Sequence, residues 1–253
     1  MAINFPTSLD NFTNPSSGNT LDSPSHSLQH SDINDAVEAM QRKVGVGSSV
    51  AGSASAGQVL TISAAGTSTW STPTPGGLVQ IVPTSVAVGS GSGSADANGA
   101  VTFSGASSIS LNGCFSSSYD TYRIIGSFQG TANGALNLRL RASGTDTTTG
   151  YYGNNIYMLY TSTAVNGGAS NNLTNIGISS VVSTANARSV LIFDAGNPNL
   201  AQFTTINAQS FQADSYFTTG GWKADNLTQY DGFTLYPASG TITGTIRVYG
   251  YKN

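Results

Sequence analysis

The stretch that decides the fold is "GALNLRLRASG", residues 134–144. Its leucines at 136, 138 and 140 alternate with Asn137, Arg139 and Arg141. A period of two places apolar side chains on one face of a strand and polar side chains on the other. The stretch "TITGTIRVYGY", residues 241–251, alternates in the same way. This pattern is typical of an antiparallel sheet with one face in a core and one in water.

Similar strand-like runs fill much of the chain beyond residue 78. They are AVTFSG (100–105), YRIIGSFQG (122–130), NNIYMLYTS (154–162), NIGISSVV (175–182), SVLIFDAG (189–196), QFTTINAQSF (202–211) and GFTLYPA (232–238). Turn-forming pairs separate the runs: Asn98-Gly99, Asn133-Gly134, Asn166-Gly167, Asn197-Pro198 and Asp231-Gly232. About ten strands at this spacing, without a convincing helix, predict a mainly β fold, an antiparallel β-sandwich of jelly-roll-like type.

The composition narrows the function classes. Charged residues make up 8% of the chain, against about 25% in a typical soluble domain. A net charge of -3 without a basic cluster argues against a nucleic-acid partner. The sequence contains neither an apolar run long enough to span a bilayer nor a signal-peptide pattern. Cys114 is the single cysteine, so an intrachain disulfide is excluded and we expect a small strand residue there.

Composition also divides the chain into three segments. Residues 1–46 are expected to form an extended arm and one short helix, residues 47–77 a small β-hairpin module and linker, and residues 78–253 the β-sandwich. Before residue 100 the aromatic residues are Phe5, Phe12 and Trp70, so a sizeable core must come from the third segment. The hairpin is expected around Val59, Leu60 and Trp70, where a short pair of strands is barely stable in isolation.

The predicted helix follows the arm and carries an apolar seam. Ile33, Val37, Met40 and Val44 are spaced four, three and four residues apart, as in a short coiled coil. A helix of fewer than about four turns is marginal in water unless this stripe is buried. We expect the partner to be another copy of the chain. The alternative is that the stripe packs on the protein's own β-domain.

Candidate catalytic groups are few. His26 and His30 are four residues apart and, with Asp32, are the best metal-ligand candidates, but Pro24 argues against a preformed helical site. A glycosidase-like acid pair would have to come from aspartates that mostly flank turn residues: Asp120, Asp146, Asp194, Asp214, Asp225 and Asp231. Aspartate is common in such turns because it binds nearby backbone N–H groups. We therefore predict neither an enzyme nor a metal or other cofactor.

Binding is the remaining chemistry. Tyr151, Tyr152, Trp222 and Tyr230 lie beside Gly and Asn in segments that are expected to be loops. Large aromatic side chains on such loops suit stacking on sugars or contact with a protein. The alternative is that these rings fill the edge of the core.

Three stretches carry a resemblance to a known family. They are "FPTSLDNFTNPSSGNTLDSPSHSLQHSDINDAVEAMQRKVGV" (5–46), "AGQVLTISAAGTSTWST" (56–72) and "YDGFTLYPASGTITGTIRVYGY" (230–251). The first resembles the N-terminal arm and helix of tailed-bacteriophage tail-fibre and other virion appendage proteins. The second is similar to a small module of such fibres, and the third to the last strands of their head domains.

The resemblance implies a homotrimer, made in the bacterial cytoplasm and built into the virion. Phe5, Leu9 and Phe12 would dock the arm on another virion protein, and the C-terminal domain would face outward toward a host glycan or protein. One compact head without a long shaft suggests a short fibre. The alternatives are a capsid decoration or head-fibre protein without a receptor, and a virion-associated polysaccharide depolymerase.

Overall fold

A computed structural model describes residues 54–62, 67–73, 76–181, 188–212 and 216–252, with six positions between 30 and 40. The chain divides into two compact units, Met1–Thr74 and Pro75–Asn253. The predicted border at residues 77 and 78 lies close to this division. The predicted border at residues 46 and 47 lies outside the described residues.

The described part of the first unit contains helical residues and a hairpin. The described helical positions are His30, Ile33, Asn34, Val37, Glu38 and Met40. The predicted hairpin is present: β1 (Val59–Ile62) pairs antiparallel with β2 (Ser68–Ser71). Its side chains include the exposed Val59, Leu60 and Ile62. Val44, Phe5, Leu9, Phe12 and His26, which the sequence singled out, lie outside the described residues.

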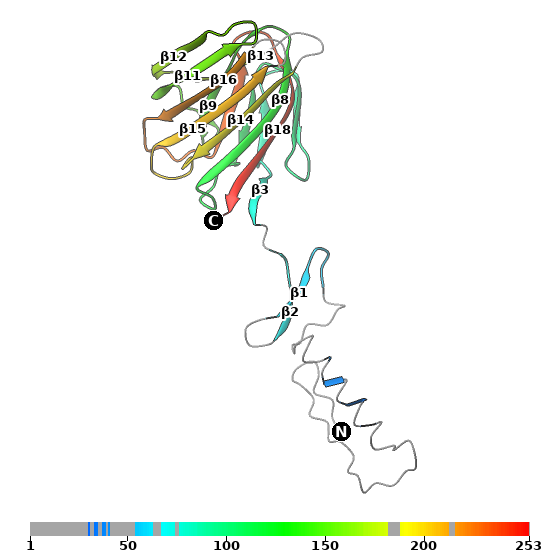
Figure 1. Cartoon of the computed structure of the whole chain (residues 1–253). Helices are drawn as coiled ribbons and strands as arrows, with labels where there is room; N and C mark the ends of the chain where they lie inside the picture. The colour runs from blue at the N-terminus through cyan, green and yellow to red at the C-terminus, as the bar shows by residue number, and fades with distance from the viewer. Residues whose placement is uncertain are drawn as a thin grey trace, which may run out of the picture. The chain divides into compact units, whose positions relative to one another are not determined.

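A ten-stranded antiparallel sheet forms one layer of the second unit (Figure 1). Its order is β12 (Val165–Leu173), β11 (Tyr151–Leu159), β16 (Tyr216–Ala224), β15 (Thr204–Gln212), β14 (Ser189–Gly196), β8 (Thr121–Gly130), β18 (Ile242–Lys252), β6 (Val101–Ala106) and β5 (Ser92–Ala95), with β3 (Gly77–Ile81) also paired to β18.

A six-stranded antiparallel sheet forms the other layer. Its order is β10 (Thr145–Asp146), β9 (Gly134–Ala142), β17 (Gly232–Pro237), β7 (Ile109–Asn112) and β4 (Ser85–Val88), with β13 (Ile176–Val181) paired to β9. The chain crosses between the sheets repeatedly, as from β8 to β9 and from β17 to β18.

The core lies between the two sheets, as the alternation in the sequence predicts. Leu136, Leu138 and Leu140 of β9 are all fully buried. Across the core, the ring of Phe193 in the large sheet meets that of Phe233 in the small sheet edge-on, with centroids 5.5 Å apart. The prediction of a mainly β antiparallel sandwich is therefore confirmed.

Two strands of the large sheet lie where the sequence suggested loops. The Asn166-Gly167 pair is not a turn but part of β12, and the "TTGGW" segment lies within β16. Glycine and asparagine are depleted in most strands, so their presence in these segments predicts loops. In β16 the sheet accommodates Gly220 because its missing side chain makes room for the indole of Trp222.

Cys114 follows the end of β7 and is buried, rather than lying in a strand as expected. Burial raises the pKa of its thiol far above the usual range. Because the thiolate is the reactive form of cysteine, this residue is a packing group in the folded protein.

Candidate functional site

The structure buries three of the four aromatic residues expected on loops, and it places Tyr151, Tyr152 and Trp222 in strands, whereas Tyr230 lies between strands. Trp222 lies in β16 and is only 5% exposed, and Tyr151 and Tyr230 are fully buried. The Tyr151 hydroxyl accepts the backbone N–H of Leu140 at 2.8 Å and donates to the Thr147 carbonyl at 3.1 Å. These three residues therefore belong to the core, whereas Tyr152 is half-buried and lies at the surface.

Trp222 is buried because two glycines leave space for its indole. A Cβ added at Gly220 would lie 2.5 Å from the indole atom Cη2, and one added at Gly153 would lie 2.5 Å from Cδ1. Real Cβ atoms do not approach so closely, so neither position can carry a side chain without displacing the ring. The glycines that suggested a flexible loop thus hold a rigid aromatic residue in place.

Adjacent glycines of β16 allow a direct test of this packing. Gly220→Ala is expected to lower the free energy of unfolding by about 1–3 kcal/mol, because overpacking must displace the indole or a strand. Gly221→Ala is the matched control, since the nearest atom to an added Cβ is the Ile206 carbonyl oxygen at 4.0 Å. We expect this control to stay within about 0.5 kcal/mol of the wild type. Urea unfolding of both variants measures the difference, and equal stabilities would contradict the packing argument.

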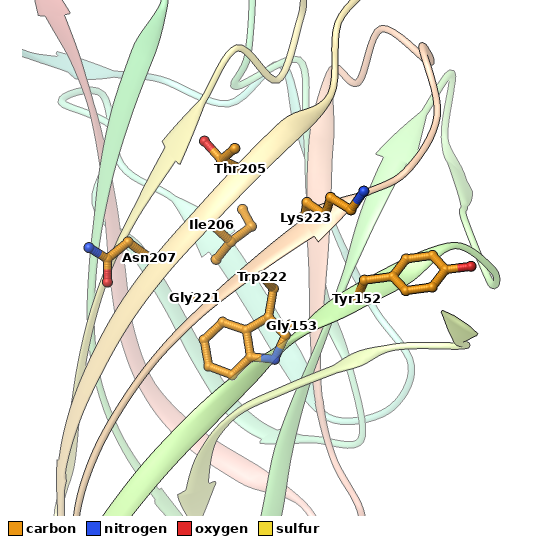
Figure 2. A pocket seen from close by; sticks show the side chains of 8 residues that line it. All are labelled: Tyr152, Gly153, Thr205, Ile206, Asn207, Gly221, Trp222 and Lys223. Carbon is orange, nitrogen blue, oxygen red and sulfur yellow. The ribbon is translucent and has the colours of Figure 1, made fainter. Parts of the chain in front are cut away.

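A shallow groove opens on the solvent side of the same strands (Figure 2). Its volume is about 480 Å³. It is lined by Tyr152, Gly153, Thr205, Ile206, Asn207, Gly221, Trp222 and Lys223. Register explains this set, because Tyr152 pairs with Lys223 and Lys223 with Thr205, while Asn207 pairs with Gly221. The missing side chain at Gly221 leaves the floor of the groove open.

Lys223 is held firmly at the rim of the groove. Its Nζ lies 2.8 Å from Asp225 Oδ1, 5.5 Å from the centre of the Tyr152 ring and 5.1 Å from that of Phe203. The carboxylate of Asp225 compensates the ammonium charge, and the two rings favour the cation between them. The rim therefore offers an oriented hydrogen-bond donor with little net charge.

The lining has the chemistry of a binding surface. It offers an aromatic ring at Tyr152, a hydroxyl at Thr205, an amide at Asn207 and the Lys223 ammonium group. No carboxylate, imidazole or thiol is among the lining residues. The titratable side chains of the lining are Tyr152 and Lys223, and Lys223 is paired with Asp225.

The aspartates considered as catalytic acids are held in structural contacts where they are described. Asp194 binds Arg123, Asp146 binds Arg141 and Asp225 binds Lys223. Asp231 Oδ2 accepts the backbone N–H of Ser143 at 3.0 Å. Asp214 lies outside the described residues. Among the described residues, no three His, Cys, Asp or Glu side chains gather as metal ligands, and no helix is long and apolar enough to cross a membrane.

One polar cluster was missed by sequence reasoning. Arg141, expected on a wet strand face, is only 13% exposed at its side chain. Its guanidinium donates to Asp146, Thr234, Ser110 and Asn112 on the outer side of the small sheet. The alternation in the sequence identifies the face on which Arg141 lies, but it does not show that the neighbouring strands β10, β17 and β7 place polar partners around it.

Comparison with known proteins gives no match: no family model fits the chain, and neither a curated protein nor a solved structure is significantly similar to it. Arguments about function therefore depend on the geometry of this chain and on the sequence resemblance noted above.

Proposed function

We propose that the chain is a bacteriophage virion structural protein, a homotrimeric short fibre whose N-terminal arm docks on the virion. Its C-terminal sandwich is displayed for attachment to the host, and the groove beside Tyr152 and Lys223 is the attachment site. The observation that carries the attachment role is this groove, with an open glycine floor between an aromatic rim and polar side chains. The docking role of Phe5, Leu9 and Phe12 belongs to the same proposal.

Exposure of the helix seam supports self-association. Ile33 is 62% exposed and Met40 64% exposed, while Val37 is half-buried. Apolar residues at seam positions favour burial against a partner.

The groove favours a neutral glycan as its ligand. A half-buried tyrosine ring can stack on the apolar face of a sugar, and amide and hydroxyl groups match sugar hydroxyls. Because Asp225 already neutralises Lys223, the site offers no unpaired positive charge for an acidic sugar. Each groove is shallow and is expected to bind weakly, so three copies would gain avidity through their high effective concentration.

Filling the groove tests this proposal. Gly221→Tyr places a ring on the open floor and is expected to reduce binding to an array of bacterial surface glycans at least tenfold. Gly177→Tyr is the control, because an added Cβ at Gly177 in β13 also meets open space, with nothing within 4 Å. Both variants should keep the melting temperature of the wild type. Equal binding by the Gly221 variant, or no glycan bound by the wild type, would contradict an attachment role for the groove.

One observation favours the capsid decoration or head-fibre alternative. Trp222, Tyr151 and Tyr230 were the rings expected to be displayed, and all three are buried. If the wild type binds no glycan or host surface but is incorporated into particles, the decoration role is the better proposal.

A further inference from the structure

The outer side of the large sheet carries a continuous row of apolar side chains. Val190, Phe211, Phe217, Met158 and Val165 are direct neighbours across five adjacent strands, β14, β15, β16, β11 and β12. Alternation along β14 and β15 turns these residues away from the core, because Leu191 and Ser210 beside them are buried. Most strands of a sandwich present polar side chains on this side.

Further apolar residues widen this row into a patch. Ile125 and Ile192 pair across β8 and β14, Ile156 lies two residues before Met158, and the Tyr160 ring meets that of Phe211 at 5.6 Å. We call the whole set the outer apolar face: Ile125, Ile156, Met158, Tyr160, Val165, Val190, Ile192, Phe211 and Phe217. The most exposed members are Val165 at 60% and Phe211 at 53%. None of the set is charged.

The area of the outer apolar face is close to that which a protein–protein interface covers on one partner. Eight of the nine residues are between 37% and 60% exposed and Phe217 is half-buried, so together they present roughly 600 Å² of apolar surface, at the upper end for monomeric proteins. A standard protein–protein interface covers about 800 Å² on each partner. The face with its immediate polar border is therefore large enough for one stable contact.

The outer apolar face and the groove occupy different ends of the same strands. Asn207 lines the groove and Phe211 belongs to the apolar row, and both lie on β15. Four residues of strand separate them by about 13 Å. A partner can therefore cover the apolar end while the groove stays open.

We propose that the outer apolar face is the surface through which the sandwich domains of this chain associate with one another. The inference rests on the proposed self-association and names the part of the domain that makes it. The occupant is a second copy, because a face of this size without charge matches itself, and because the exposed helix seam of the first unit calls for the same partner. In a trimer the outer apolar faces of the three copies would meet around the threefold axis, where each face contacts both of the others.

The experiment compares the molar mass of full-length proteins by light scattering over a range of concentrations. The test variant carries Met158→Asp and Phe211→Asp, on either side of Phe217 in the row. Both positions are exposed in a single chain, so the domain should fold and keep its melting temperature. The control is Thr102→Asp, which adds a charge on the same side of the large sheet, on β6, outside both the face and the groove.

The wild type and the control are expected to have a multiple of the 25.9 kDa chain mass. The double variant should require at least a hundredfold higher concentration to associate, because assembly would bury two carboxylates. If the double variant has the same molar mass as the wild type, the inference is overturned. If Val37→Asp dissociates the protein in that case, the helix alone holds the copies together, and the proposed trimer is retained. A wild type of 25.9 kDa at about 100 μM overturns the self-association itself, and the groove can still be tested by glycan binding.

Discussion

Replacing Trp222 with alanine is expected to lower the free energy of unfolding by about 3–5 kcal/mol, one of the larger losses that a single substitution causes. The indole is 5% exposed and lies against Gly153 and Gly220, which carry no side chains that could move into the vacated space. A cavity bounded by backbone collapses poorly, and the cost of a large-to-small substitution rises with the volume that stays empty.

Tyr152→Ala is the comparison that separates packing from binding. Tyr152 is half-buried on the solvent side of β11, next to Trp222's neighbour Lys223. Its loss should cost far less stability than the loss of Trp222 but should weaken glycan binding. Thermal unfolding and binding are measured for both variants. If Trp222→Ala keeps the melting temperature of the wild type but abolishes binding to host cells, Trp222 acts as an exposed binding residue, and its burial in the core is contradicted.

The periodic parts of the sequence predicted the sandwich well. In β9 single polar residues separate Leu136, Leu138 and Leu140, and in β18 Arg247 separates Ile246 from Val248. Such alternation has one solution in a two-layer β fold, with the apolar residues inward. The buried Leu138 and Val248 are examples. The buried face of such a strand can be predicted without knowing its neighbours, because the hydrophobic effect buries the apolar face whichever strand lies beside it.

The strand β16 shows where such reasoning ends. Its "TTGGW" segment contains the same residues that form loops elsewhere, and only the neighbouring β11 shows why they form a strand. Gly220 faces the core and makes room for Trp222, whereas Gly221 faces solvent and leaves the groove open. Two adjacent glycines thus have opposite roles. Which of them faces the core depends on strand pairing between residues far apart in the sequence.

The outer faces of the two sheets each carry an Arg–Asp pair, and the two pairs differ in their surroundings. Arg141 and Asp146 lie in the small sheet with side-chain exposures of 13% and 23%, and the hydroxyl groups of Thr234 and Ser110 join them. Arg123 and Asp194 lie in the large sheet with exposures of 37% and 32%. Water screens the second pair more than the first, so the same substitution should have unequal effects.

Arg141→Leu is expected to lower the free energy of unfolding by about 2–4 kcal/mol, because it leaves Asp146 and the buried Thr234 hydroxyl without their main donor. Arg123→Leu removes the paired charge at the more exposed site and should cost no more than about 1 kcal/mol. The matched substitutions are compared by urea unfolding at low and at high salt. Added salt should reduce the loss caused by Arg123→Leu more than the loss caused by Arg141→Leu, because salt screens the exposed Arg123–Asp194 pair more strongly than the less exposed Arg141–Asp146 pair. Equal losses for the two variants would mean that the hydroxyl groups around Arg141 add no stability beyond that of an exposed Arg–Asp pair.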